Sequence, residues 1–152
     1  MRTLSSLLIS SSLVAALSLT GCGGGSEAVT AAPTSGTPTA SGCTKSSAKI
    51  GKSATLSTRA HGVSGKATVV DDCTITITNF FYDGGGAQSV FVYGGLAGNY
   101  GQGFAIGSNI KGVSYTGQTL TLTLKTGDLD KLDGLSIWCS DVRVSFGDGL
   151  FI

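Results

Sequence analysis

Sulfur chemistry in this chain depends on four cysteines, Cys22, Cys43, Cys73 and Cys139. No two of them have the Cys-x-x-Cys spacing, which argues against a thioredoxin-type redox pair and against a zinc site built from four thiolates. The Cys-x-x-Cys-His motif is absent as well, which excludes the ordinary covalent attachment of a c-type haem. The cysteines are therefore candidates for lipid attachment, for disulfide bonding and for the chemistry of a single thiol.

Cys22 ends an N-terminal segment with the features of an export signal. Arg2 supplies a positive charge, residues 4–19 are mostly apolar, and a Leu-Thr-Gly tripeptide precedes the cysteine. This order resembles the signal of bacterial lipoproteins, in which cleavage leaves a lipid-bearing cysteine as the new N-terminus. We therefore expect residues 1–21 to be removed and the lipid on Cys22 to hold the protein on a membrane of the cell envelope.

Residues 22–42 have the composition of a flexible tether. After Cys22 they consist of Gly, Ser, Thr, Ala, Val and Pro with Glu27 as the single charge, and such a segment cannot bury enough apolar surface to fold. Gly23 stands where an aspartate usually retains lipoproteins at the inner membrane, so we expect an outer-membrane or cell-surface location. Both prolines lie in this segment, which leaves a domain at 43–152 free of proline, as is typical of strand-rich chains.

The domain shows the period-two alternation of half-buried strands. Isoleucines alternate with threonines in residues 73–78, and leucines alternate with threonines in residues 119–124. Further predicted strands lie at 54–59, 66–70, 89–93, 104–106 and 135–146. Short strands separated by glycine-rich turns, with no segment of helical period, predict an all-β fold, a small antiparallel β-sandwich.

Cys73 and Cys139 are both in phase with the apolar residues of their strands. In a compartment that permits disulfides, Cys43, Cys73 and Cys139 leave one thiol over. We favour a bond between Cys73 and Cys139, because it would join facing sheets as in immunoglobulin domains. Cys43, at the end of the tether, is the alternative partner for either one. Under the favoured pairing Cys139 is structural, and otherwise it is a candidate redox thiol.

The final predicted strand contains a change of phase. Its apolar positions are odd-numbered up to Cys139 and even-numbered from Val142 to Phe146. We expect a bulge or bend at Ser140-Asp141 that keeps both halves turned toward the core. Cys139 then points inward and Trp138 points to the opposite face.

A set of short motifs occurs in a fixed order along the domain. The segments are His61-Gly62-Val63-Ser64-Gly65, Val69-Val70-Asp71, Asn79-Phe80, Tyr82-Asp83-Gly84-Gly85-Gly86, Ser136-Ile137-Trp138-Cys139 and Phe146-Gly147. Together they resemble the successive motifs of the DM13 domain, over nearly all of residues 59–152. The resemblance implies a sandwich of the DOMON-like or jelly-roll-like kind. It also implies extracellular electron transfer through a cysteine, here Cys139, that acts as a bare thiol or helps to hold a haem.

The residues themselves give little support to a haem. The part of the chain after Cys22 has one histidine, His61, and no methionine, so axial ligands are scarce. His61 is more simply interpreted as a turn residue. Asp83 before Gly84 predicts a hairpin turn, since these residues supply positive backbone dihedrals. We do not favour a haem, and we predict no metal site.

Charge and motif content narrow the function classes. Without Arg2 the basic and acidic residues are equal in number, nine of each, and the lysines are scattered, which argues against nucleic acid as a partner. One histidine and no Gly-x-Ser-x-Gly motif argue against a conventional hydrolase. We expect an accessory electron-transfer protein of the envelope rather than a classical enzyme. The alternative is a non-catalytic adhesion or ligand-binding module stabilised by a disulfide, and the sequence names neither a redox partner nor a ligand.

Overall fold

The computed structural model describes residues 43–152 and contains eight strands and two short 3₁₀ helices. The strands are β1 Ser53–Thr58, β2 Ser64–Asp71, β3 Thr74–Tyr82, β4 Val90–Gly95, β5 Phe104–Ile106, β6 Tyr115–Thr123, β7 Gly134–Cys139 and β8 Val144–Leu150. The 3₁₀ helices are η1 Tyr100–Gln102 and η2 Leu129–Lys131. The signal, the tether and Cys22 lie outside the described residues. Within residues 43–152 there is no helix with the length and hydropathy to span a bilayer.

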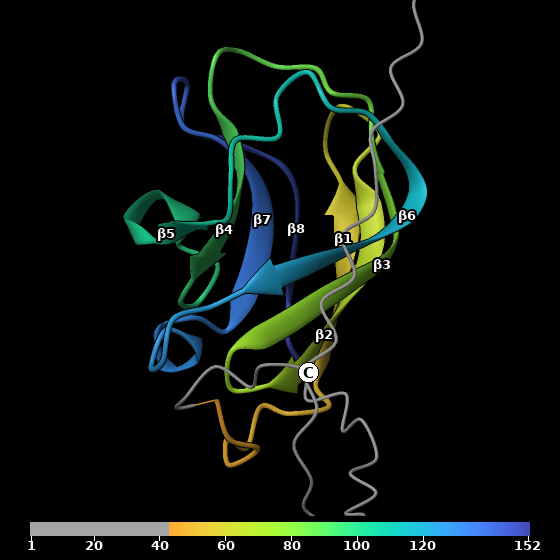
Figure 1. The fold of residues 1–152 in the computed structure, drawn as a ribbon. Helices are drawn as coiled ribbons and strands as arrows, with labels where there is room; N and C mark the ends of the chain where they lie inside the picture. The colour runs from red at the N-terminus through yellow and green to blue at the C-terminus, as the bar shows by residue number, and fades with distance from the viewer. Residues whose placement is uncertain (1–42) are drawn as a thin grey trace, which may run out of the picture. The chain divides into compact units, whose positions relative to one another are not determined.

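All neighbouring strands are antiparallel, in the order β5-β4-β7-β8-β1-β2-β3-β6. Strand β1 pairs with β2 along its first residues and with β8 at Ser57 and Thr58, so it joins the two halves of a curled sheet. The β4–β7 side and the β3–β6 side face each other across the interior (Figure 1). The predicted antiparallel all-β fold is confirmed.

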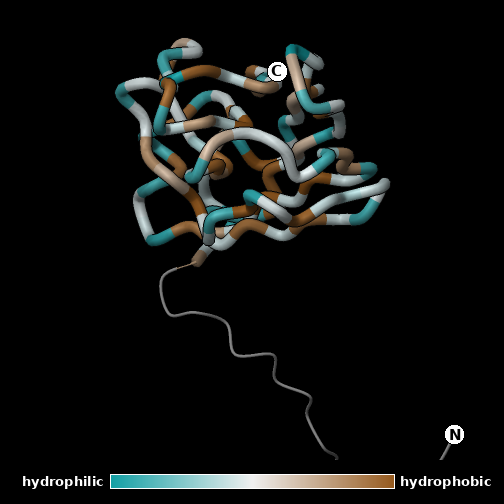
Figure 2. The backbone as a smooth tube through the Cα atoms, turned by 90° about the horizontal axis from the view of Figure 1, so that it is seen from above, coloured by the Kyte–Doolittle hydropathy of each residue, from teal (hydrophilic) through white to brown (hydrophobic). Residues whose placement is uncertain are grey.

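The core is built from the inward residues of both halves. Alternation places Ile75 and Ile77 of β3 against the same interior as Val92 of β4 and Ile137 of β7, all at most 1% exposed. Figure 2 shows hydrophobic and hydrophilic residues alternating along the strands of the domain. Burying such apolar surface contributes about 25 cal/mol per Å², which makes this interior the main source of stability.

The disulfide joins Cys43 to Cys73, so the favoured pairing of Cys73 with Cys139 is wrong. Cys73 directly precedes β3, whereas Cys139 pairs with Val90, whose side chain lies against Gly86 just beyond the far end of that nine-residue strand. At about 3.3 Å per residue the two ends are separated by roughly 30 Å. The period-two phase predicts which face of the sheet a side chain occupies. It does not predict where along the length of the sandwich that residue lies. The alternative partner, Cys43, is the correct one.

The bulge or bend predicted at Ser140-Asp141 is a tight turn that separates β7 from β8. The first half faces the core as predicted, since Leu135, Ile137 and Cys139 are buried. In the second half only Phe146 does, because Val142 and Val144 are 60% and 43% exposed. The irregularity in pairing lies opposite Ile137 and Trp138 instead. The prediction for the end of β7 is confirmed, because Cys139 points into the core and Trp138 to the outer face.

Candidate functional site

Cys139 is the free cysteine of the described residues, and the core encloses it completely. It is the last residue of β7, paired with Val90 of β4 on one side and with Val144 of β8 on the other. Its exposed fraction is 0%. A thiol in this position cannot reach a partner's disulfide, so thiol–disulfide exchange would require the core to open.

Tyr82, the last residue of β3, is the titratable group near this thiol. Its side chain is buried, and its hydroxyl donates a hydrogen bond to the carbonyl of Gly85. Burial raises the pKa of Tyr82 to about 12, with a smaller contribution from the negative charge of Asp83. Tyr82 is therefore a neutral phenol at neutral pH, and it lies within electrostatic range of the Cys139 sulfur.

His61 and Asp83 form a pair beside Tyr82, closer to solvent. The Nδ1 atom of His61 lies 3.1 Å from Oδ1 of Asp83, and the imidazole stands 4.3 Å from the Phe146 ring and 6.4 Å from the Tyr82 ring, centre to centre. The backbone N–H of Gly85 donates to the Asp83 carboxylate at 2.7 Å and, with His61, holds the pKa of Asp83 below its usual range. The backbone of His61 has φ +54° and its carbonyl accepts the N–H of Asp83, so the predicted turn role is confirmed.

The glycines after Asp83 allow the turn to lie directly on these rings. Gly84 and Gly86 have φ +82° and +106°, but the predicted hairpin is wrong. Strands β3 and β4 are not paired, so residues 83–89 cross from the β3–β6 side of the sheet to the β4–β7 side. A Cβ on Gly86 would lie 2.8 Å from the Phe146 ring, and one on Gly85 would collide with the His61 imidazole. The Tyr82-Asp83-Gly84 motif is thus explained by close packing over the end of the core that holds Cys139.

Trp138 lies on the outer face of β7, within a row of aromatic rings. Its ring centre is 6.1 Å from that of Tyr93 on β4 and 6.5 Å from that of Tyr100 in η1, and Phe91 follows Tyr93 at 6.4 Å. Arg143 donates from Nη2 to the carbonyl of Gly101 at 3.1 Å, which fastens the η1 segment beside the indole. These separations are within the range of favourable ring–ring contact.

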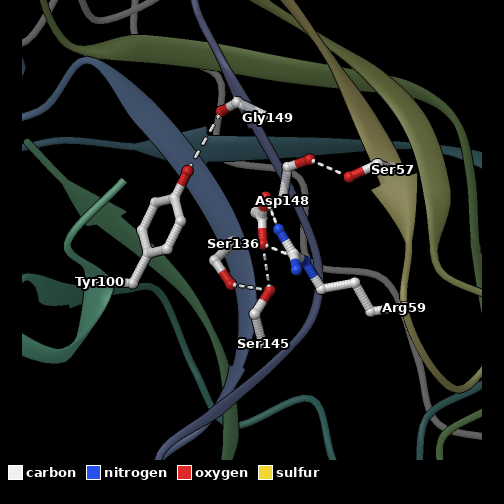
Figure 3. Close-up of polar contacts among 7 residues, drawn as sticks. All are labelled: Ser57, Arg59, Tyr100, Ser136, Ser145, Asp148 and Gly149. Carbon is white, nitrogen blue, oxygen red and sulfur yellow. Dashed lines mark hydrogen bonds and ion pairs between the residues drawn. The ribbon is translucent and has the colours of Figure 1, made fainter. Parts of the chain in front are cut away.

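On the same side of β7 as Trp138, the structure has a hydrogen-bonded network that sequence reasoning did not predict (Figure 3). Ser136, fully buried, donates to Oγ of Ser145 at 2.9 Å, and Ser145 donates to Asp148 at 2.7 Å. Arg59 donates to both oxygens of Asp148, from Nε at 2.7 Å and from Nη2 at 3.0 Å. Burial alone would raise the pKa of Asp148, but the hydrogen bonds from Arg59 and Ser145 outweigh it and the pKa lies below its usual range.

This network should make stability depend on acid pH. A carboxylate with a lowered pKa stabilises the fold above its unfolded value of about 3.9, and the stabilisation is lost as the pH falls through the lower folded value. An Asp148→Asn variant should be less stable than the native chain at pH 7 by roughly 1 kcal/mol, because the pair with the exposed Arg59 is partly screened. Urea unfolding at pH 7 and at successively lower pH measures this difference, which should shrink as the native carboxyl becomes protonated.

The control for this experiment is Asp130→Asn, which removes an exposed carboxyl from η2. A stability difference between the native chain and Asp148→Asn that stays constant down to the lowest pH would contradict the assignment of the acid dependence to Asp148.

The structure brings some of the sequence-predicted residues together and separates others. Cys139, Tyr82, His61, Asp83 and Gly84 meet at one end of the core. Asp71 lies at the opposite end, where its Oδ1 accepts the backbone N–H of Cys73 at 2.9 Å beside the Cys43–Cys73 bond.

The site does not fit a haem held by Cys139. The sulfur is packed among core side chains and is inaccessible to a porphyrin. Within residues 43–152, no three or more His, Cys, Asp or Glu side chains gather closely enough to hold a metal ion. No step of the chemistry below is therefore assigned to a haem.

Comparison with known proteins yields one family and two curated relatives. The model of the family described as "Electron transfer DM13" matches residues 55–150. "Protein Skeletor, isoforms B/C" of Drosophila melanogaster is 35% identical over 95 residues, which is 58% of this chain and 12% of the relative. Isoforms D/E of the same protein are 35% identical over 95 residues, 58% of this chain and 6% of that relative. The chain thus spans a small part of these relatives, and no solved structure matches it.

Proposed function

The chain belongs to the electron-transfer DM13 family, and from that premise we propose that it is a lipid-anchored protein of the cell envelope that carries single electrons on Cys139. The observation that supports this role is the state of the three cysteines after Cys22. Cys43 and Cys73 are bonded to each other, while Cys139 is free and enclosed beside Tyr82. Because the core encloses Cys139, its sulfur cannot contact the sulfur of a partner for two-electron thiol–disulfide exchange. A single electron, by contrast, can be transferred through a layer of protein.

The proposed redox step is balanced by an external one-electron acceptor and an external one-electron donor. In oxidation the S–H bond of Cys139 breaks, the electron passes to the acceptor and the proton goes to solvent, which leaves a thiyl radical. In reduction the donor returns one electron and the sulfur takes up a proton. Each cycle therefore moves one electron from donor to acceptor and leaves the protein unchanged.

The proposal includes the attachment of the protein to a membrane of the cell envelope. Lipid on Cys22 would hold the domain at a membrane, with the outer membrane or cell surface as the expected address because Gly23 follows the cysteine. A tether of residues 22–42 would let the domain meet redox partners near that surface.

The test is a count of electrons given by the purified domain to a soluble one-electron oxidant such as hexachloroiridate. The native domain should yield one electron per chain reversibly, and Cys139→Ala should lose that reversible electron. Val90→Ala is the matched control, because it removes methyl groups from the strand position paired with Cys139 while the sulfur remains. Equal counts for the native domain and Cys139→Ala would refute the thiol as carrier.

A second candidate function is a non-catalytic adhesion or ligand-binding module. Two observations favour it: the disulfide makes a purely structural use of two cysteines, and a row of aromatic rings lies on the outer face. Aromatic rows bind sugars and other small rings. An electron count that does not depend on Cys139 would favour this function over the first.

A further inference from the structure

The aromatic row on the outer face contains the chain's single tryptophan, Trp138. The indole is only half-buried, whereas Tyr100 at its side is 4% exposed and donates from its hydroxyl to the carbonyl of Gly149 at 3.4 Å. Of these two rings, therefore, the indole is the one that a redox partner on the outer face can approach.

Trp138 is also the covalent neighbour of the enclosed thiol. Consecutive residues of a strand point to opposite faces, so one peptide linkage of β7 separates a sulfur in the core from an indole on the outside. We propose that Trp138 is the residue through which the electron of Cys139 leaves the core toward the outer face. This inference rests on the proposed function and names the exit of the same site.

A one-electron acceptor docked on the outer face takes an electron from the Trp138 indole, which becomes a radical cation and keeps its N–H proton. An electron from the Cys139 sulfur then refills the indole as the S–H bond breaks, with the proton going to solvent. The acceptor belongs to the class of one-electron carriers with a potential high enough to oxidise an indole.

The other aromatic neighbour of the thiol is a poorer exit. Tyr82 is 1% exposed and its hydroxyl is held by the Gly85 carbonyl, so a partner at the surface cannot reach the phenol. Trp138 is half-buried on the outer face, and an indole can give up an electron before it loses its N–H proton.

The surroundings of Trp138 hold it in one place. The rings of Tyr93 and Tyr100 flank the indole at 6.1 and 6.5 Å, and Arg143 bonds to the backbone of η1 beside it. A fixed, partly dry environment lowers the reorganisation that accompanies a change of charge, as preorganised sites do in catalysis.

Because Trp138 is the chain's single tryptophan, flash photo-oxidation tests the inference directly. A soluble ruthenium photo-oxidant generates the indole radical, and transient absorption follows its decay in the native domain, in Cys139→Ala and in Trp138→Phe. Cysteine-dependent refilling should make the indole radical decay about tenfold faster, or faster still, in the native domain than in Cys139→Ala. Tyr115→Phe, which removes a phenol from the β6 side of the core, is the control and should decay as the native domain does.

Equal radical lifetimes in the native domain and Cys139→Ala, or no indole radical in Cys139→Ala, would overturn Trp138 as the exit. The electron count with hexachloroiridate separates this failure from failure of the proposed function. If the count depends on Cys139 while the radical lifetime does not, the thiol is the carrier and the exit lies elsewhere. If the count is independent of Cys139, the proposed function itself is refuted.

Discussion

Breaking the Cys43–Cys73 disulfide should lower the free energy of unfolding of the domain by about 3–4 kcal/mol. The bond closes a loop with a sequence separation of 30 residues, and a cross-link of that length removes chain entropy worth about this much from the unfolded state. Small domains are stable by roughly 5–15 kcal/mol in total, so the expected loss is a large share. Urea unfolding of a Cys43→Ser variant measures it, because Cys43 is only partly buried and the substitution leaves Cys73 in the core.

Hydrogen bonds to Asp72 also hold the first residues of the domain in place. They therefore limit how much free energy of unfolding is lost when the disulfide is broken. Thr44 donates to Asp72 from Oγ1 at 2.7 Å and Ser47 donates from its backbone N–H at 2.9 Å. Bonds from Thr44 and Ser46 above all, with Ser47, lower the pKa of Asp72 to about 2, so the carboxylate persists well into acid. The first residues of the domain should therefore stay near the β2–β3 turn without the disulfide, and the fold should weaken rather than disappear.

Thiol counting under denaturing conditions supplies the control. The unfolded native domain should react with one equivalent of reagent, at Cys139, and a Cys73→Ala variant should expose a second thiol at Cys43. A reductant should destabilise the native domain but not the Cys43→Ser variant. If Cys43→Ser unfolded at the same urea concentration as the native domain, the bond would not be a stabilising element.

The strands were predictable because their signal is local. Alternation of Ile with Thr in β3 and of Leu with Thr in β6 repeats every two residues, which is the period of side-chain faces in a sheet. The same rule correctly placed Cys139 inside and Trp138 outside.

The disulfide and the polar network were not predictable, because they depend on where distant strands meet. Cys73 and Cys139 both point toward the core but lie at opposite ends of it. No periodicity in the sequence encodes the position of a residue along the strand direction. Arg59 and Asp148 are 89 positions apart and become neighbours only because the last strand returns to pair with the first. Asp148 lies between two glycines, which on sequence alone indicates a turn rather than an ion pair inside a strand.

In the candidate site, too, local features were predictable from the sequence and contacts between distant segments were not. The positive backbone dihedral of Gly84 and the turn role of His61 were predictable from their own residues. The hairpin expected at Asp83-Gly84 was not correct, because local residues specify a change of direction but not the strand that the chain pairs with next. The meeting of His61 and Asp83 was not predictable, since it requires the turn after β1 and the turn after β3 to lie side by side. Only the assembled sheet places this pair over the end of the core that contains the free thiol.

Replacing Cys22 with alanine should abolish membrane attachment of the cleaved protein, as the proposed lipid anchor requires. A lipid chain contributes about 0.8 kcal/mol per buried CH₂ group, and stable attachment takes two or more chains or a chain with a basic patch. Residues 23–42 carry Glu27 as their single charge, so electrostatic attraction to anionic lipid cannot replace the lipid. The alanine variant should accumulate as an uncleaved precursor or as a soluble protein, since the processing that follows lipidation would lack its substrate.

Fractionation into membrane and soluble pools, followed by detergent phase separation, measures this outcome. Cys43→Ser is the matched control, because it removes another cysteine near the N-terminus while leaving Cys22 in place. The native chain and Cys43→Ser should enter the detergent phase, and Cys22→Ala should enter it only as precursor still carrying residues 1–21. If cleaved Cys22→Ala protein continued to partition into detergent, something other than a lipid on Cys22 would be the anchor, and the envelope location would need a different physical basis.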